Sequence, residues 1–276
     1  MDDLLQHPAV QAGIAPLLVG LVVAAALWRT RFAWFAVVAA YATAVMLSTG
    51  LTLQPLTAGR KVTLVMLLAP FIGAAFDAWP RPPRWLWAAL ALICGALAWW
   101  VFASLLMQRE GADRVLVSLG LLAFVAALTA LTLRLRDDGI GAAATGVAGA
   151  LAIGVAALLS ASIGYFVGGI ALAAGAGALL ALQFVLNRAH APGYTGTLPI
   201  GSALALFTSA CVLLAQLAWY VLPLLALVPW AAYAGSTRGG PLRARAFTAA
   251  GLATAAAVLF VAAVWLAGRA TALPST

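Results

Sequence analysis

Charge is what this sequence has least of. Asp, Glu, Lys and Arg together make up 8% of its 276 residues, and only seven residues are acidic. A soluble domain carries about a quarter charged residues, because its surface faces water. A chain with 65% hydrophobic residues and a mean hydropathy of +1.08 cannot cover such a surface. The composition therefore predicts a protein whose main solvent is lipid, with no separate soluble domain.

Histidine and cysteine are also scarce, with two residues of each type. His7 and His190 fall on opposite faces of the membrane in the topology derived below, and Cys94 and Cys211 lie within apolar runs. These residues cannot form a metal or haem site, nor a nucleophile with its acid and base. We therefore expect no cofactor and no bound metal. For the same reason we lean against an enzyme.

The basic residues give the chain a net charge of +8 and a pI near 10.5. They are scattered singly or in small groups between apolar runs, which is typical of topology determinants and argues against nucleic-acid binding. Almost all are arginines, and Ala, Gly and Leu dominate, a composition typical of a bacterial genome rich in G and C. The chain starts with the acidic pair Asp2 and Asp3, so the first apolar run is interpreted as a retained span. These features predict a multi-pass protein of the bacterial inner membrane.

Apolar runs long enough to cross a membrane recur along the chain. A hydrocarbon core about 30 Å thick needs about 20 helical residues. Charge, proline or glycine separates ten such runs. They cover residues 11–28, 32–51, 62–78, 84–106, 115–134, 139–159, 163–186, 198–215, 219–235 and 246–268. The sequence thus predicts an all-α integral membrane protein with about ten transmembrane helices in a single bundle, forming one domain over residues 1–276.

Two junctions between spans carry no charge: small polar residues interrupt one apolar run at 160–164, and the other junction lies within residues 198–235. Residues 198–235 are a single apolar stretch of 38 residues, which as one helix would be about 57 Å long. Because this length far exceeds the membrane thickness, the stretch should fold back on itself. Gln216, Trp219, Tyr220 and Pro223 mark the expected turn, since aromatic residues with polar edges favour the interface and proline is tolerated in a first helical turn.

The distribution of basic residues predicts the orientation. The odd-numbered connections hold ten: Arg29, Arg31, Arg81, Arg84, Arg134, Arg136, Arg188, Arg238, Arg243 and Arg245. The even-numbered connections and tails hold five: Arg60, Lys61, Arg109, Arg114 and Arg269. The positive-inside rule then puts both termini on the outer face. Ten spans also divide into two halves of five, whose odd number would make a 5+5 pseudo-repeat inverted, as in many secondary transporters.

The third span holds most of the candidate functional residues. Asp77 is the only acidic residue that approaches the interior of a span. Ionisable groups are costly inside a membrane, so one interpretation is a proton or cation site. The alternative is an interfacial carboxylate paired with Arg81 or Arg84.

Arg60 and Lys61 precede the same span on the expected outer side, where basic residues are disfavoured. They predict either an anion-binding mouth or a solvated loop. Pro70 lies in the middle of the span, where it would free a backbone carbonyl and bend the helix. The third span therefore has the best claim to line a substrate pathway.

Other polar residues within the spans are mild. Serine and threonine readily bond their own helix backbone, so they are expected to support packing. Gln183 is the least ordinary, since it could bind a polar solute if it faced the bundle. The Gly-rich spans over 139–159 and 163–186 favour close helix packing and could also mediate self-association or contacts with other membrane subunits.

Three functions remain open. The first is a small-molecule permease or flippase with its site between helices. The alternative is an accessory or assembly subunit of a larger membrane complex, suggested by the lack of strongly polar residues in the spans. A membrane enzyme acting on lipid is the third, weakened by the missing catalytic groups.

Overall fold

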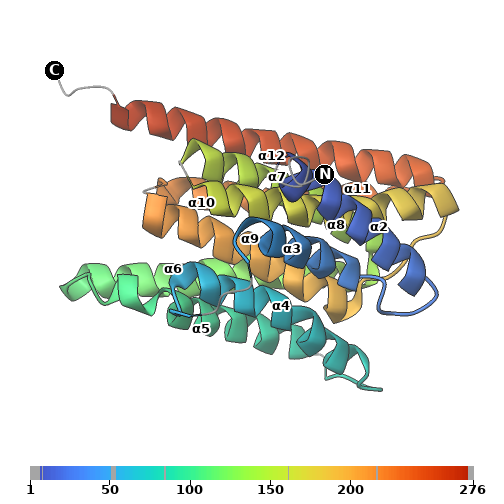
Figure 1. Ribbon diagram of the computed structural model, residues 1–276, viewed down its shortest axis with the longest axis horizontal. Helices are drawn as coiled ribbons and strands as arrows, with labels where there is room; N and C mark the ends of the chain where they lie inside the picture. The colour runs from blue at the N-terminus through green and yellow to red at the C-terminus, as the bar shows by residue number, and fades with distance from the viewer. Residues whose placement is uncertain are drawn as a thin grey trace.

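The computed structural model describes residues 7, 9–50, 54–83, 85–160, 162–215 and 217–272. Within these residues every regular element is a helix. Nine helical segments of this described part are long and apolar enough to cross a membrane, and the shorter apolar helix α3 (Phe35–Ser48) accompanies them. The expected helical membrane bundle of about ten helices is confirmed (Figure 1).

The helices follow one another with short connections. Their bounds are η1 (Val10–Ile14), α2 (Ala15–Leu27), α3 (Phe35–Ser48), α4 (Ala58–Asp77), α5 (Leu86–Leu106), α6 (Gly111–Leu133), η2 (Arg134–Asp137), α7 (Gly139–Leu159), α8 (Ile163–Leu186), α9 (Gly193–Ala215), η3 (Trp219–Val221), α10 (Leu222–Leu225), α11 (Leu227–Ser236) and α12 (Leu242–Ala272). Three spans are composite: η1 continues into α2, α6 continues into η2, and η3, α10 and α11 together form the third. Helices α7 and α8 coincide with the spans expected over 139–159 and 163–186.

Four helices, α4, α6, α9 and α12, begin four or five residues earlier than the sequence predicts. Helix α4 starts at Ala58 because the Thr57 hydroxyl accepts a hydrogen bond from the Arg60 N–H at 3.4 Å and so caps the helix. Arg60 therefore lies in the first turn of a helix, whereas the sequence places it in the preceding loop. Helix α9 starts at Gly193, so Pro199 lies inside the helix and not at its beginning.

Helix α3 is shorter than the span expected over 32–51. Its 14 residues cover about 21 Å. The chain before it forms turns, and after it Gly50 adopts a φ of 70°, a conformation that suits glycine and ends the helix. The N–H groups of Thr49 and Gly50 both donate to the Val45 carbonyl, which completes the C-terminal cap.

The hairpin expected within 198–235 is confirmed. Helix α9 ends at Ala215 and the next helical residue is Trp219, while Gln216 lies outside the described residues. Tyr194, at the start of α9, accepts a hydrogen bond from Arg136, and Ser236, at the end of α11, donates one to Asp138. Because Arg136 and Asp138 flank the same short turn, the chain must cross the bundle and return between residues 193 and 236.

The bundle has two ends, which we name after the residues at the two ends of α4. At the Arg60 end α3, α5, α7 and α9 finish and α4, α6 and α8 begin. At the Asp77 end α4, α6, α8 and α11 finish and α5, α7, α9 and α12 begin. The Arg60 end is at the left of Figure 1 and the Asp77 end is at the right.

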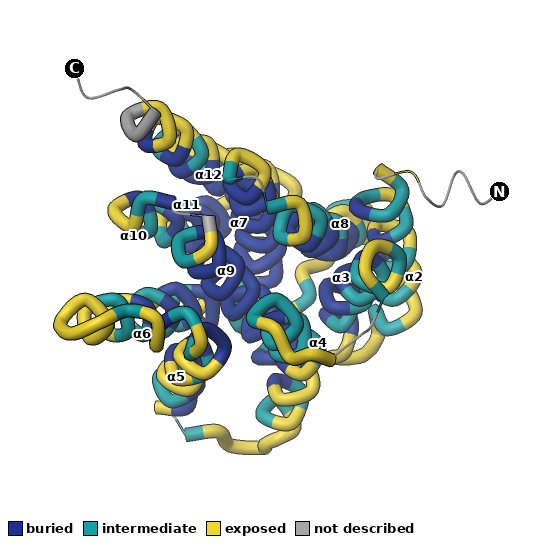
Figure 2. Tube along the Cα trace, turned by 60° about the vertical axis from the view of Figure 1, so that its left-hand side comes forward, coloured by how far each residue is buried: buried dark blue, intermediate teal, exposed yellow. Residues whose placement is uncertain are grey.

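Helices α7 and α9 form the centre of the bundle. Figure 2 shows them largely buried, with the other helices around them. Glycine makes the close packing of α7 on α8 feasible, because a Cβ on Gly146 would lie 2.7 Å from the Ala176 methyl, and one on Gly169 would lie 2.8 Å from the Ala150 carbonyl oxygen. These glycine faces are filled by the chain's own helices.

The helices pair in the same order in the two halves of the chain. In the first half α2 packs on α3 and α5 packs on α6, whereas α4 makes few contacts with its neighbours in sequence. In the second half α7 packs on α8 and α11 packs on α12, while α9 stands apart in the same way. The two middle helices, α4 and α9, pack on each other, and so do α3 and α8. These two contacts form much of the boundary between the halves.

Candidate functional site

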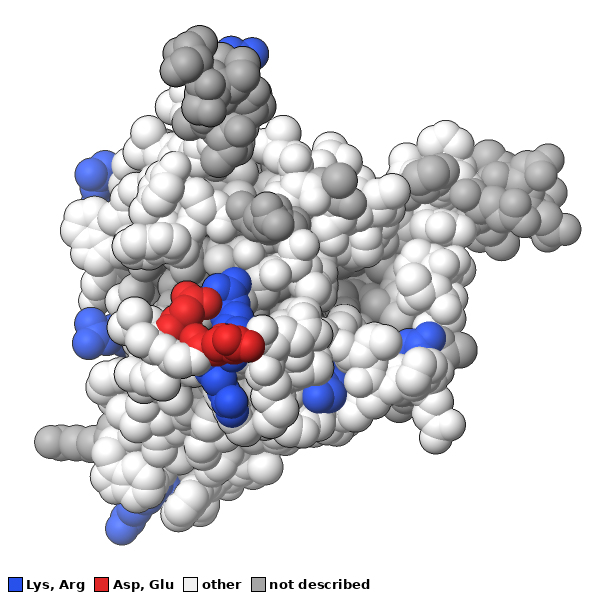
Figure 3. Space-filling model, turned by 90° about the vertical axis from the view of Figure 1, so that its left-hand side faces the viewer, with Lys and Arg blue, Asp and Glu red and all other residues white. Residues whose placement is uncertain are grey.

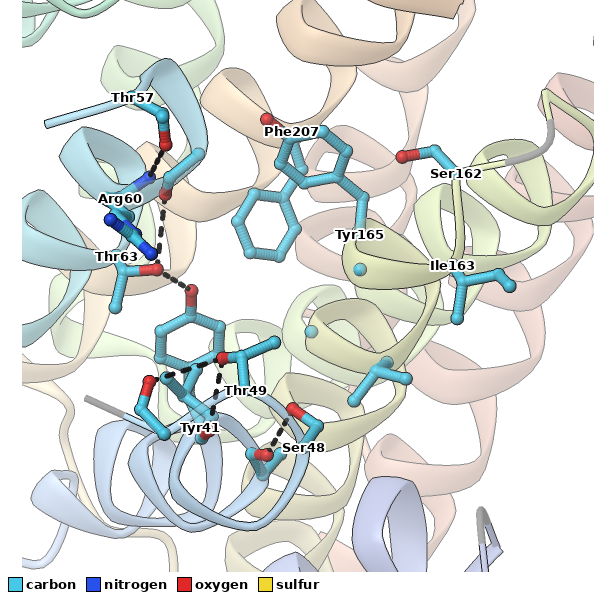
Figure 4. A pocket seen from close by; sticks show the side chains of 17 residues that line it. Tyr41, Ser48, Thr49, Thr57, Arg60, Thr63, Ser162, Ile163, Tyr165 and Phe207 are labelled. Atoms are coloured by element: carbon cyan, nitrogen blue, oxygen red, sulfur yellow. Dashed lines mark hydrogen bonds between the residues drawn. The ribbon is translucent and has the colours of Figure 1, made fainter. Parts of the chain in front are cut away.

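A cavity of 470 Å³ lies between α3, α4, α8 and α9, the four helices that meet at this boundary. Two of these helices come from each half of the chain. Thr49, Thr57 and Ile163 line the cavity and are exposed at helix ends, so the cavity reaches the Arg60 end of the bundle (Figure 4). Its volume falls in the range of small-molecule binding sites, about 300–1,000 Å³.

Aromatic rings form the inner part of this cavity. The centroid of the Phe207 ring lies 5.5 Å from that of Tyr165 and 6.0 Å from that of Tyr41. The Tyr41 hydroxyl bonds the Thr63 hydroxyl at 3.0 Å, which joins α3 to α4. Gly168 allows α8 to approach this cluster, because a Cβ there would lie 3.0 Å from the Phe207 ring. The inner wall is thus apolar but carries hydroxyl groups at fixed positions.

Arg60 is the basic residue that lines the cavity, near its mouth (Figure 4). Its guanidinium Nη1 donates to the Pro55 carbonyl at 2.9 Å, which holds the half-buried side chain beside the turn. The adjacent Lys61 points elsewhere: its Nζ donates to the Trp100 carbonyl of α5 at 3.1 Å and lies 4.8 Å from the Trp100 ring centroid. From the sequence, Arg60 and Lys61 are interpreted as one feature. In the structure Arg60 lines the cavity, whereas Lys61 contacts Trp100 of α5.

Asp77 lies at the opposite end of α4. It follows Arg60 by 17 residues, which corresponds to about 25 Å along the helix. Its carboxylate accepts hydrogen bonds from the backbone N–H groups of Tyr194 and Thr195, each at 2.8 Å, and from the Thr195 hydroxyl at 2.6 Å. Asp77 therefore caps the N-terminus of α9, where free amides and the helix dipole favour a negative charge.

The expected arginine partners of Asp77 have different outcomes. Arg84 lies outside the described residues, and Arg81 forms no ion pair with Asp77 in the described part of the chain. Arg31 instead donates to the backbone carbonyl of Asp77 at 2.8 Å, which attaches the turn after α2 to the end of α4.

Gln183 is buried at the Asp77 end, away from the cavity. Its Nε2 donates to the Gly139 carbonyl at 3.3 Å, and its Oε1 accepts from the His190 N–H at 3.2 Å. The side chain thereby connects the end of α8, the start of α7 and the turn before α9. All of its recorded partners are backbone groups of the protein.

Further hydrogen bonds hold the Asp77 end together. Asp138 accepts from the Gly141 N–H at 3.1 Å and from the Ser236 hydroxyl, so it caps α7 and attaches α11. Arg136 donates to the Tyr194 hydroxyl, with its guanidinium carbon 5.4 Å from the Tyr194 ring centroid. Polar side chains thus connect α4, α7, α8, α9 and α11 at this end.

Proline interrupts both middle helices, α4 and α9, which pack on each other across the boundary. A Cβ on Gly73 of α4 would overlap the Tyr194 carbonyl, and the Ser202 hydroxyl lies 3.9 Å from the Met66 sulfur. These contacts put Pro70 of α4 and Pro199 of α9 at about the same level of the antiparallel pair. Each proline lacks an N–H group and so leaves a carbonyl without its helical partner.

The structure thus divides the residues singled out from the sequence. Arg60 lines the cavity, whereas Lys61 faces α5. Asp77 and Gln183 form hydrogen bonds at the opposite end of the bundle. Pro70 is buried between the cavity and that end.

Sequence reasoning missed four residues of this region: Tyr41, Tyr165 and Phe207 of the cavity, and Pro199. The three aromatic residues lie within apolar runs, where nothing in the local pattern distinguishes a wall residue from a lipid-facing one. Pro199 could have been found, because a proline near the start of an apolar run can also lie inside a helix that begins earlier.

Charge is sparse elsewhere on the molecule. Figure 3 faces the Arg60 end, where acidic side chains gather in one place with basic side chains around them and uncharged side chains cover most of the rest. Arg109 and Asp113 of this end form an ion pair at 2.8 Å. Among the described residues no three His, Cys, Asp or Glu side chains lie close enough together to hold a metal ion.

Comparison with known proteins adds no assignment: the sequence matches no protein-family model and no curated protein.

Proposed function

We propose that this protein is a small-molecule permease that binds its solute in the cavity between α3, α4, α8 and α9. The observation that carries the proposal is the position of the cavity, at the boundary between two halves whose helices pair in the same order. Solute sites of secondary transporters with repeated halves lie at such boundaries. The cavity is lined by side chains of both halves, so relative movement of the halves would change access to it.

The difference between the two ends of the bundle supports the same proposal. The cavity reaches the Arg60 end, whereas hydrogen bonds of Asp77, Gln183 and Asp138 join helices at the other end. A permease must expose its site to one side of the membrane at a time. In the proposed cycle, the solute enters at the Arg60 end, and release requires α4 to separate from α9 at Asp77.

The paired prolines provide a place for that separation. Pro70 and Pro199 lie between the cavity and the Asp77 end, at about the same level of α4 and α9. Helices bend where a proline removes a backbone hydrogen bond, and broken helices at the repeat boundary are a feature of transporters. We assign Asp77 the role of holding the closed end, and Arg60 that of receiving solute at the open end. In a bacterial inner membrane with both termini outside, the open end would face outward.

The test is solute flux through the purified protein in liposomes. A panel of labelled organic acids, amines, sugars and amino acids is compared for wild type, protein-free liposomes and a Ser48→Phe variant. Ser48 lines the cavity and is exposed, so a larger side chain there would occupy the cavity without disturbing the packed interior. We expect at least one solute class to cross faster with wild type than with Ser48→Phe. Equal flux of every solute in both proteins would contradict the permease proposal.

An accessory or assembly subunit is the second candidate. A groove of 490 Å³ runs between α7 and α12 and is lined almost entirely by apolar residues, including Leu151, Val155 and Trp265. Such a groove could hold a helix of another membrane subunit. Purification in mild detergent, followed by identification of the proteins retained, tests this alternative. A stoichiometric protein partner lost in a Val155→Trp variant would favour it over the permease.

A further inference from the structure

The groove between α7 and α12 is separate from the cavity at the boundary of the halves. Its floor consists of alanines: Ala148, Ala152 and Ala257 are buried, and their small side chains leave space between the two helices. Larger apolar side chains form its walls, and those of Val155 and Val258 are exposed on the outside of the bundle. In a membrane that outside faces hydrocarbon, so the groove opens toward the acyl chains of lipids.

The groove has the length of one leaflet of the membrane. Helices α7 and α12 both begin at the Asp77 end, so they run in parallel toward the Arg60 end (Figure 1). The lining residues lie within 148–159 of α7 and 254–265 of α12, from about the middle of each helix toward its C-terminal end. An advance of 11 residues corresponds to about 16 Å along a helix. Because one leaflet contributes about 15 Å of the hydrocarbon core, the groove matches the acyl region of the leaflet at the Arg60 end.

A cation lies at the end of the groove that reaches the membrane interface. Arg269 is exposed in the last turn of α12, and its guanidinium carbon lies 3.8 Å from the ring centroid of Trp265, which lines the groove. Neither of the ion pairs within the described residues involves Arg269. A guanidinium stacked on a ring keeps its N–H donors directed outward in its own plane. Tryptophan and arginine at the end of a span are typical of the interface, where lipid phosphates lie.

These features favour a phospholipid over a helix of another subunit. A partner helix would cross the whole hydrocarbon core of about 30 Å, roughly twice the length of the groove, and an apolar helix would offer no group to Arg269. A phospholipid has an acyl chain of leaflet length and a phosphate at the interface, and arginine pairs with phosphate through two parallel hydrogen bonds. A zwitterionic headgroup would also bring a positive charge close to Arg269, so a net negative headgroup fits better.

We infer that the groove binds one anionic phospholipid, with an acyl chain along Val155 and Val258 and its phosphate at Arg269. This charge also gives a reason for a basic residue on the expected outer side, where the positive-inside rule disfavours one. The inference concerns a site outside the cavity and does not depend on the permease proposal.

The test is lipid binding to the purified full-length protein in detergent, measured by native mass spectrometry, which counts the lipids on each protein molecule. The probes are phosphatidylglycerol, phosphatidylcholine with the same acyl chains, and glycerol 3-phosphate, which has a phosphate but no chain. Arg269→Gln removes the cation, and its matched control Arg114→Gln removes an exposed cation of α6 at the same end of the bundle. Val155→Trp fills the groove from its exposed side, and Leu158→Trp adds the same ring to an exposed position of α7 outside the groove.

We expect wild type, Arg114→Gln and Leu158→Trp to bind the first phosphatidylglycerol at least about 5-fold more tightly than phosphatidylcholine. A 5-fold difference corresponds to about 1 kcal/mol, the contribution of one basic residue near anionic lipid. Arg269→Gln should lose this preference and bind the two lipids alike. Val155→Trp should bind the first molecule of either lipid at least about 5-fold more weakly than wild type does, because the indole occupies the place of the chain. Glycerol 3-phosphate should not bind.

Other outcomes would overturn the inference in distinguishable ways. If wild type bound both lipids equally, or if Arg269→Gln and Arg114→Gln lost the preference equally, Arg269 would not hold the headgroup. Unchanged lipid binding in Val155→Trp would show that the chain lies elsewhere. Binding of glycerol 3-phosphate as tight as that of phosphatidylglycerol would identify a soluble phosphate as the ligand. A protein that co-purifies with wild type and Arg269→Gln but not with Val155→Trp would show that a partner helix fills the groove. None of these results bears on the cavity.

Discussion

At the scale of single residues, one carboxylate has a role that depends on a distant segment. Asp77 bonds the first amides of α9, more than 110 residues away in the sequence. Gly193 makes this contact feasible: it adopts a φ of 59°, and a Cβ there would overlap the Asp77 carboxylate. The sequence could identify Asp77 as unusual, since acidic residues in spans are rare. It could not identify the partner, because helix capping between segments leaves no local pattern.

Neutralising Asp77 should therefore destabilise the folded protein. In Asp77→Asn one oxygen is replaced by an amide that cannot accept hydrogen bonds, and the favourable charge at the helix N-terminus is lost. We expect a cost of about 1–2 kcal/mol, measured as a lower midpoint of thermal unfolding in detergent. The control is Asp113→Asn, which removes an exposed ion pair and an exposed carboxylate in the first turn of α6, and should cost less than Asp77→Asn, about 0.5 kcal/mol. Equal midpoints for the two variants would contradict the capping role.

At the scale of helices, the sequence predicted the presence of each helix better than the residues at which it begins and ends. Helices α7 and α8 coincide with their expected spans, because Asp138 precedes α7, Asn187 and Arg188 follow α8, and small polar residues separate the two helices. Helices α4, α6 and α12 begin four residues early and α9 begins five residues early. Thr57 caps α4 from within the same segment, whereas the cap of α9 comes from Asp77 of another helix and is not visible in the local sequence. Three of the serine and threonine residues behave as expected, since Ser48, Thr208 and Ser209 each bond a carbonyl of their own helix.

The central position of α9 also gives a testable consequence. Ala205 on α9 is fully buried, whereas Ala255 on α12 is exposed. Ala205→Leu inserts three carbon atoms into a filled space, which should cost about 1–3 kcal/mol. Ala255→Leu adds the same atoms to a surface that faces lipid and should leave stability nearly unchanged. Thermal unfolding of the two purified variants provides the comparison, and an equal loss in both would show that α9 is not the central helix.

At the scale of the whole molecule, hydropathy and charge predicted a bundle of about ten helices but not the packing of one helix on another. The boundary between the halves depends on contacts such as Gly73 with Tyr194 and Tyr41 with Thr63, which join residues far apart in the sequence. The cavity is a consequence of that packing, so its aromatic wall could not be predicted. Arg60 could be identified from the sequence, because a basic residue on the expected outer side is an exception to the positive-inside rule.

The orientation of the bundle remains a prediction from the ten-to-five distribution of basic residues. Single cysteines are introduced as Arg188→Cys or Arg109→Cys in a variant carrying Cys94→Ala and Cys211→Ala. A membrane-impermeant maleimide applied to intact cells should label position 109, while position 188 should react only after the membrane is permeabilised. Labelling of position 188 in intact cells would reverse the orientation and put the cavity on the cytoplasmic side.

The closure of the Asp77 end should be adjustable by the bonds that hold it. Ser202 lies on the α4-facing side of α9, buried against Met66 between the two ends. In a variant carrying Ser202→Cys and no other cysteine, labelling by a small thiol reagent reports how often α4 separates from α9. A loss of about 1–2 kcal/mol from the closed state raises the open population about 5- to 30-fold. Adding Asp77→Asn should therefore raise the labelling rate by that factor, whereas adding Asp113→Asn should not.

A protein in which Cys94 is the only cysteine, labelled with and without Asp77→Asn, measures global unfolding. If Cys94 reacts faster to the same extent, the variant is unfolding and not opening, and if neither cysteine changes, Asp77 does not hold the end closed.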